Sequence, residues 1–214
     1  MATLAEIAEQ SRAALDARHA AREQALALSR EVIRTCATAI RAIHRSEFDR
    51  ARELIAAAGD RIAQLSAGLA GQLDLYGAGY VYDCQKEFAE ACLVYALLTD
   101  EPLPDPRSLG IDYPAYLNGM GEAVGEMRRH VLDEMRRGNL ARAEQLLNQM
   151  DEIYFLLVTL DYPDAMTGGL RRTTDAVRGI VEKTRGELTT ALRQDELRDA
   201  IRAALGRLDA SSPR

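Results

Sequence analysis

The chain has 214 residues, of which 47% are hydrophobic and 5% aromatic, so it is long enough to bury one sizeable core. Ala, Leu, Arg and Glu dominate, Gly and Pro are few and Trp is absent, a composition that favours helices and excludes a sheet-rich fold. The formal net charge of -6 provides no overall attraction for nucleic acid, so such binding would require a local basic patch.

The segment from Thr3 to His44 contains no Pro or Gly and carries apolar residues at loose helical spacing. This pattern predicts one long helix or two joined end to end. Three prolines between positions 102 and 106 exclude helix there. The later predicted helices cover residues 46–75, 80–98, 114–136, 140–160, 170–192 and 195–208. Because short links imply antiparallel neighbours, we expect an all-α, seven-helix antiparallel bundle forming one domain over residues 1–210, with a disordered tail at 211–214.

Cysteine usage and the N-terminal sequence indicate the compartment. Cys36, Cys84 and Cys92 are an odd number without close spacing, so they predict buried small hydrophobes in a reducing environment and no disulfide framework. The first residues are too charged for a signal peptide, and no apolar run approaches the roughly 20 residues that span a bilayer. We expect a cytoplasmic protein that does not associate with membranes.

Two acidic pairs at helical spacing are the most informative feature of the chain. Glu87 and Glu90 are three residues apart, and Glu122 and Glu126 are four residues apart, so each pair shares one helix face. If the two helices pack together, four carboxylates could meet in one cleft. Ligands that offer only oxygen favour Mg²⁺ or Mn²⁺ over softer metals.

The surroundings of these glutamates strengthen the metal hypothesis. Glu87 falls within an apolar row of its helix, so its carboxylate is expected to be partly buried and to need a proton, a cationic partner or a metal ion. Gly119, Gly121 and Gly125 surround the second pair, although each glycine inside a helix costs about 1 kcal/mol relative to alanine. Close approach of another backbone, or clearance for a ligand, would offset that cost.

Other interpretations remain open at this stage. The four glutamates could be ordinary solvated residues of an acidic helical protein. A di-iron site of the ferritin type would need Glu-x-x-His motifs, and the three histidines do not form one: they are His19, His44 and His130. No catalytic triad or Gly-rich phosphate loop is visible, so nucleophilic catalysis and nucleotide hydrolysis have no support.

Four segments, in their order and spacing, resemble the translin family: residues 85–91, 116–129, 150–154 and 169–178. The resemblance extends from about Arg22 to Leu188, and it is closest to the catalytic branch, translin-associated factor X and its prokaryotic homologues. It implies a seven-helix subunit that assembles into a closed shell, here expected to be a homo-octamer, and that handles RNA or single-stranded DNA inside it.

The resemblance also implies roles for individual residues. Glu87, Glu90 and Glu122 match the family's metal-dependent endoribonuclease residues, and Glu126 matches a further carboxylate that completes the metal site. The family usually has aspartate where this chain has Glu122.

Basic residues near the acidic set are candidate nucleic-acid contacts: Lys86, Arg128, Arg129, Arg171 and Arg172. Arginine suits bidentate contacts with phosphate, and the family resemblance implies RNA contacts around the Arg171–Arg172 turn. However, charges of alternating sign follow one stripe from Arg171 to Arg185, and this pattern equally indicates a solvent-exposed face with ion pairs.

Three functions are therefore open. The first is an Mg²⁺- or Mn²⁺-dependent endoribonuclease. The second is an RNA- or single-stranded-DNA-binding assembly without catalysis, which Glu122 in place of aspartate and the acidic net charge favour. The third is a purely structural helical oligomer.

Overall fold

The structure, a computed structural model, describes the backbone of residues 2–211 and the side chains of residues 2–208. This part of the chain contains nine helices and no strand, which confirms the all-α prediction. Three of the helices are single turns. The elements are α1 (Leu4–His44), α2 (Phe48–Gly68), α3 (Leu73–Tyr76), α4 (Gly79–Thr99), α5 (Pro106–Leu109), α6 (Tyr113–Arg137), α7 (Leu140–Val158), α8 (Asp164–Thr167) and α9 (Leu170–Ser211).

The described residues fall into two compact units. The first contains residues up to 123 together with 162–170, and the second contains residues 124–161 together with the chain from 171 onward. The single domain over residues 1–210 stays a prediction. The predicted tail begins at Ser211, where α9 ends, and its remaining residues, 212–214, lie outside the described part of the chain.

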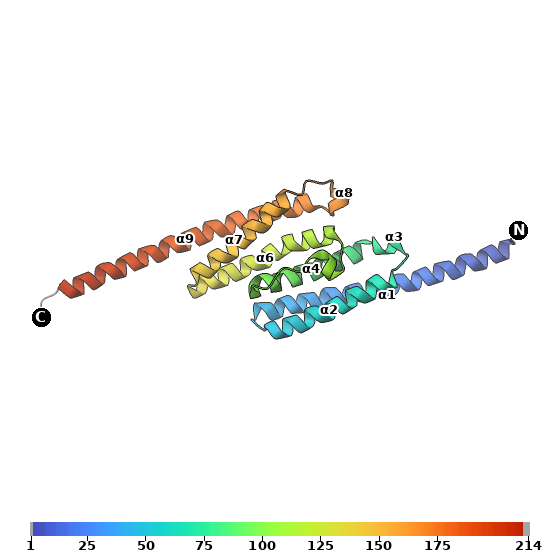
Figure 1. The fold of residues 1–214 in the computed structure, drawn as a ribbon, viewed down its shortest axis with the longest axis horizontal. Coiled ribbons are helices and arrows are strands. Elements are labelled where there is room, and N and C mark those ends of the chain that lie inside the picture. The colour runs from blue at the N-terminus through green and yellow to red at the C-terminus, as the bar shows by residue number, and fades with distance from the viewer. Residues whose placement is uncertain (1, 212–214) are drawn as a thin grey trace. The chain divides into compact units, whose positions relative to one another are not determined.

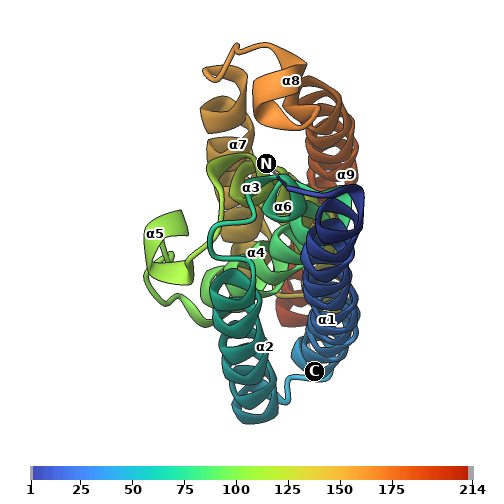
Figure 2. The same ribbon diagram turned by 90° about the vertical axis from the view of Figure 1, so that its right-hand side faces the viewer.

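In the first unit, α1 and α2 form an antiparallel hairpin, and α4 packs against both helices (Figures 1 and 2). Thr3 caps the N-terminus of α1: its side chain accepts from the Glu6 amide while the Glu6 side chain accepts from the Thr3 amide, a reciprocal capping box. Its buried residues lie between Ala25 and Ile43, and its N-terminal part extends past α2 (Figure 1). The helix α4 has thirteen buried residues, which makes it the central helix of this unit.

Two boundaries in the first unit differ from the predictions. The second predicted helix, 46–75, ends at Gly68, because Gly71 adopts a left-handed conformation with φ of +82° and separates α2 from the single turn α3. The proline-rich loop contains a helical turn, α5, that begins at Pro106. Proline is tolerated at the first position of a helix, where its missing N–H is not needed, and Asp105 caps this turn by accepting from two backbone amides.

In the second unit, the C-terminal part of α6 packs with α7 and α9 around an aliphatic core. The helix α7 buries Leu146, Leu147, Met150, Ile153 and Leu157, whereas Tyr154 on the same stripe is half-buried. The core residues from the other two helices are Val124, Met127, Val131, Val177, Val181 and Leu188. A left-handed glycine, Gly138, makes the turn between α6 and α7, as its position after the predicted helix indicated.

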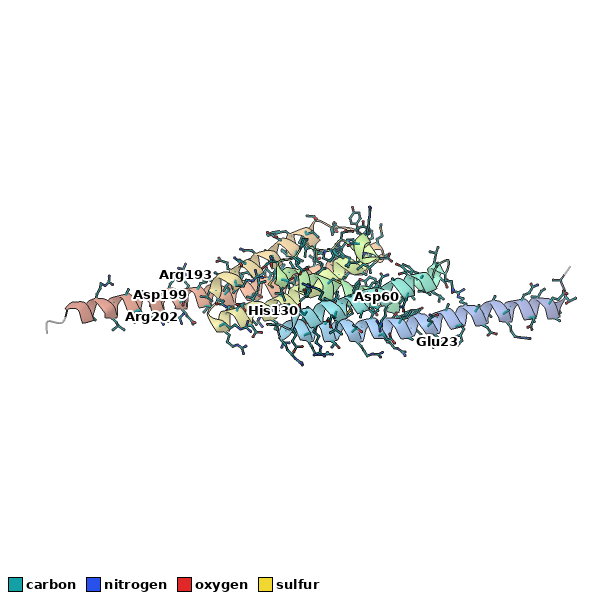
Figure 3. The ribbon with its side chains drawn as sticks, turned by 60° about the horizontal axis from the view of Figure 1, so that its bottom comes forward. Glu23, Asp60, His130, Arg193, Asp199 and Arg202 are labelled. Atoms are coloured by element: carbon teal, nitrogen blue, oxygen red, sulfur yellow. The ribbon has the colours of Figure 1, made fainter. Side chains whose placement is uncertain are left out.

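The predicted break at Asp195 is absent, and α9 continues through it to Ser211. Asp195 forms an ion pair with Arg198 on the same helix, so it does not act as a cap. The C-terminal part of α9 also carries ion pairs from Arg193 to Glu196 and from Arg202 to Asp199 (Figure 3). Such i,i+3 pairs support a continuous helix, and neither Gly nor Pro interrupts residues 187–205.

None of the helices in the described part of the chain combines the length and apolarity needed to span a bilayer.

Candidate metal centre

Three of the four predicted glutamates converge in the first unit. Glu87 and Glu90 lie on α4 and Glu122 lies on α6, and one carboxylate oxygen from each comes within 4.8 Å of the others. Glu90 is buried, with 8% of its surface exposed, whereas Glu87 and Glu122 are half-buried. The carboxylates therefore face one another across two packed helices.

Gly119 explains why α4 and α6 can approach so closely. A Cβ atom at this position would lie 2.5 Å from the Lys86 carbonyl oxygen and 2.8 Å from the Ala89 Cβ, so no side chain fits there. Glu122 follows Gly119 by three residues and shares its helix face. The expectation that a glycine beside the acidic pair allows close backbone approach is thus correct for Gly119. It does not hold for Gly125, where a Cβ would meet no atom within 4 Å.

A turn docked beside these helices was not anticipated from the sequence. Asn118 on α6 is buried and donates to the carbonyl oxygen of Thr167 at 2.8 Å. Tyr82 on α4 donates to the carbonyl oxygen of Gly168 at 3.3 Å, and Gly168 has a φ of +62°. The two helices that carry the acidic residues thereby both hold the end of α8. The glycine pair at 168 and 169 is the feature of the sequence that could have indicated this turn.

Lys86, one of the predicted nucleic-acid contacts, lies against the acidic cluster. Its Nζ donates to Glu122 Oε1 at 2.5 Å. Only 21% of the Lys86 side chain is exposed. Burial alone would lower the pKa of Lys86, but the hydrogen bond and charge of Glu122 outweigh that effect and raise it. The ammonium group is therefore held in its charged form against Glu122.

Burial and like charge act together on Glu87. Desolvation raises the pKa of the Glu87 carboxyl, and the neighbouring negative charge of Glu122 raises it further. The positive charge of Lys86 acts in the opposite direction and lowers the pKa of Glu87, and a metal ion bound among these carboxylates would act in the same direction as Lys86. The donor set consists of carboxylate oxygens from three side chains, which fits a hard divalent cation such as Mg²⁺ or Mn²⁺ and leaves coordination positions for other oxygen ligands.

Glu126, the fourth predicted ligand, is not part of the group of three. It lies one turn further along α6, on the part of that helix assigned to the second unit. Its role in a metal site stays a prediction.

The predicted nucleic-acid contacts differ in how they are engaged. In the second unit, Arg128 donates to Thr184 Oγ1 at 2.8 Å and to Glu187 Oε1 at 3.0 Å, and 18% of its side chain is exposed. Two of its guanidinium nitrogens therefore tie α6 to α9, while the adjacent Arg129 is exposed. Contact with nucleic acid stays a prediction for both.

The arginines of α9 lie on an exposed, ion-paired face. Arg171 and Arg172 are exposed, and Arg171 donates to Asp161 at 2.9 Å. Arg178 pairs with Glu182 on the same helix, and Arg185 pairs with Asp151 of α7. These pairs favour the interpretation of the stripe as a solvated face.

No family model matches the chain. The uncharacterized protein MJ0175 of Methanocaldococcus jannaschii is 35% identical over 183 residues, covering 85% of this chain and 81% of that protein. The crystal structure of AfC3PO, from Archaeoglobus, is 28% identical with a TM-score of 0.80, covering 87% of this chain and 97% of that one.

Two further structures share the fold. A complex of AfC3PO with duplex RNA is 28% identical with a TM-score of 0.78, covering 87% of this chain and 96% of that one. Apo-NeC3PO, from Nematostella, is 18% identical with a TM-score of 0.78, covering 89% of this chain and 100% of that one, a likeness of fold alone.

The architecture and the cluster define an all-helical protein with carboxylates gathered where two central helices cross. The likeness to the C3PO structures fits a relative of the translin family that resembles its translin-associated factor X branch.

Proposed function

We propose that this chain binds RNA and cleaves it as an Mg²⁺- or Mn²⁺-dependent endoribonuclease, with Glu87, Glu90 and Glu122 as the metal-binding and catalytic residues. The observation that carries the proposal is the convergence of their oxygens within 4.8 Å in a half-buried site. The solved complex of the related AfC3PO with duplex RNA supports RNA as the ligand class.

The three carboxylates would hold the cation and leave part of its coordination open. Glu87 and Glu90 supply ligands from adjacent turns of α4, and Glu122 supplies one from α6. Without a cation these groups repel a phosphodiester, so the substrate and the carboxylates are incompatible. A bound divalent cation would supply charge that neutralises the phosphate and lowers the pKa of an attacking water. Attack of that water on phosphorus would break the bond to the leaving ribose oxygen; the water would give up one proton to solvent, and the leaving oxygen would take up one.

Assembly into a homo-octamer is part of the proposal. Four apolar residues of α9 are exposed by more than half at helical spacing: Leu197, Ile201, Leu205 and Leu208. An exposed apolar stripe of this length is typical of a protein interface. The N-terminal part of α1 likewise exposes Leu4 and Leu15. Solution mass measurement tests the number of subunits.

Cleavage of labelled single-stranded RNA in the presence of Mn²⁺ tests the catalytic assignment. We expect Glu87→Gln to abolish cleavage, because it removes a ligand without changing the shape of the side chain. Asp83→Asn is the matched control. Asp83 is exposed on α4, one turn before Glu87, and its substitution by asparagine removes the same charge. Equal cleavage by wild type and Glu87→Gln would refute the assignment.

A non-catalytic RNA- or single-stranded-DNA-binding assembly is the second candidate. Two observations favour it: Glu122 stands where the family usually has aspartate, and Lys86 is bound to the Glu122 carboxylate. Salt-dependent binding that persists in EDTA, with no cleavage products, would support this function over the first. Absence of any binding at low salt would instead indicate a purely structural oligomer.

A further inference from the structure

The ion pair between Lys86 and Glu122 lies inside the candidate metal centre. The Lys86 Nζ is 2.5 Å from Glu122 Oε1, and Glu122 is one of the three residues whose oxygens converge. Lys86 is also adjacent in sequence to Glu87, on the central helix of the first unit. A cationic side chain of the protein thus contacts one carboxylate that the metal would use.

We propose that Lys86 is a built-in competitor of the divalent cation: it neutralises Glu122 in the metal-free protein and must leave that carboxylate when the cation binds. This inference rests on the proposed metal centre. It assigns to Lys86 the role of setting the cation concentration at which the site fills.

The geometry makes the two cations rivals for Glu122. The Lys86 ammonium lies 2.5 Å from Glu122 Oε1, and a magnesium-sized ion would have to approach the carboxylate oxygens to about 2.1 Å. Both charges would then lie within a few ångströms of each other. Even with water-like screening, repulsion between an ammonium and a divalent ion at that separation corresponds to about tenfold or more in affinity.

Burial adds to the competition. With 21% of the Lys86 side chain and 38% of the Glu122 side chain exposed, the pair is screened less than a surface ion pair. When the three carboxylates and the ammonium are all charged, their formal sum is -2, because three negative charges meet one positive charge. The site therefore still attracts a divalent cation, but less strongly than it would without the lysine.

Mn²⁺ affinity of the metal-free, full-length protein tests the proposal without any measurement of activity. Free Mn²⁺ is followed by electron paramagnetic resonance during titration of wild type, Lys86→Met, Lys86→Arg and Lys183→Met. Lys183 is the matched control, because it is the chain's other lysine, is exposed and lies on α9. We expect the dissociation constant of Lys86→Met to fall about tenfold or more, with Lys86→Arg and Lys183→Met close to wild type.

A second readout uses thermal unfolding. Lys86→Met leaves the acidic cluster without this cation, so its melting temperature in EDTA is expected to be lower than that of wild type and to rise more on addition of Mn²⁺. Circular dichroism confirms that the variant is folded. If Lys86→Met does not fold, Lys86→Gln, which keeps a polar end group, decides the question by the same titration.

The outcomes separate this proposal from the function on which it rests. Mn²⁺ binding that Glu87→Gln abolishes but Lys86→Met does not tighten would overturn the role of Lys86 and leave the metal centre intact. No Mn²⁺ binding by wild type or by either Lys86 variant would overturn both the role of Lys86 and the metal centre. Weak binding by wild type with tight binding by Lys86→Met is the strongest support.

Discussion

Substitution of Gly119 by alanine should separate the two helices that carry the acidic cluster. The added Cβ would lie 2.5 Å from the Lys86 carbonyl oxygen, whereas ordinary van der Waals contact begins at 3.4 Å. The helices must therefore open by about 0.9 Å along this line. The opposing atom belongs to the backbone of α4, so a side-chain rotation cannot relieve the contact.

The expected cost follows from two opposing effects. Overpacking of a tight contact costs about 1–3 kcal/mol, while replacing glycine by alanine inside a helix gains about 1 kcal/mol. We expect a net loss of up to about 2 kcal/mol in the free energy of unfolding, together with weaker Mn²⁺ binding because Glu122 moves away from Glu87 and Glu90. Such a displacement matters because metal ligands tolerate only a few tenths of an ångström.

Gly125→Ala is the control for this experiment. Gly125 lies on the same helix, and a Cβ there meets no atom within 4 Å, so this variant should gain about 1 kcal/mol from helix propensity alone. Urea unfolding of both variants, with Mn²⁺ titration alongside, measures the difference. If Gly119→Ala is as stable as Gly125→Ala and binds Mn²⁺ like wild type, the close crossing does not assemble the site.

Three further outcomes follow from the structure. Arg128→Ala should lower the free energy of unfolding by about 1–2 kcal/mol because it removes charge-assisted hydrogen bonds between α6 and α9. Substitution of the exposed Arg129 by alanine should change it by less than about 0.5 kcal/mol. Unfolding in urea measures both values, and equal effects would contradict the role of Arg128. Because the pKa of Glu87 is raised in the folded protein, its ionised form opposes folding as pH rises through the folded-state pKa. In EDTA at pH 7, Glu87→Gln should therefore have a larger free energy of unfolding than wild type, and this difference should vanish as pH falls below the ordinary pKa of 4.5. A difference that is constant with pH would contradict this. The double substitution Ile201→Glu and Leu205→Glu should reduce the mass of the assembly measured by light scattering. An unchanged mass would exclude the exposed apolar stripe of α9 from the interface.

The helices could be predicted wherever the chain contains strong local signals. The antiparallel hairpin and the turn at Gly138 follow from periodicity and chain-breaking residues. The predicted start of a separate helix at Asp195 is wrong, because an aspartate can either cap a helix or pair with Arg198 within it, and the surrounding helix decides between the two. The early end of α2 depends on the left-handed conformation of Gly71, which the residue permits but does not require.

The acidic cluster could be predicted only in part from the sequence. Spacing along one helix places Glu87 and Glu90 on a common face, but the register between two helices depends on where they cross. Lys86 illustrates this limit, because its hydrogen-bond partner is Glu122 of another helix. Gly119 was the signal of the crossing, because a glycine inside a helix needs a compensating contact.

The crossing at Gly119 connects the assembly of the metal centre to its competitor. The atom nearest to a Cβ at Gly119 is the carbonyl oxygen of Lys86, so the contact that brings Glu122 toward α4 also brings it within reach of the Lys86 ammonium. Opening the crossing should then weaken both interactions of Glu122 together. The effects of Gly119→Ala and Lys86→Met on Mn²⁺ affinity are therefore expected to be non-additive, because part of the gain from removing the lysine requires the close crossing. Strict additivity in that double-mutant cycle would mean that the two residues act on the site independently.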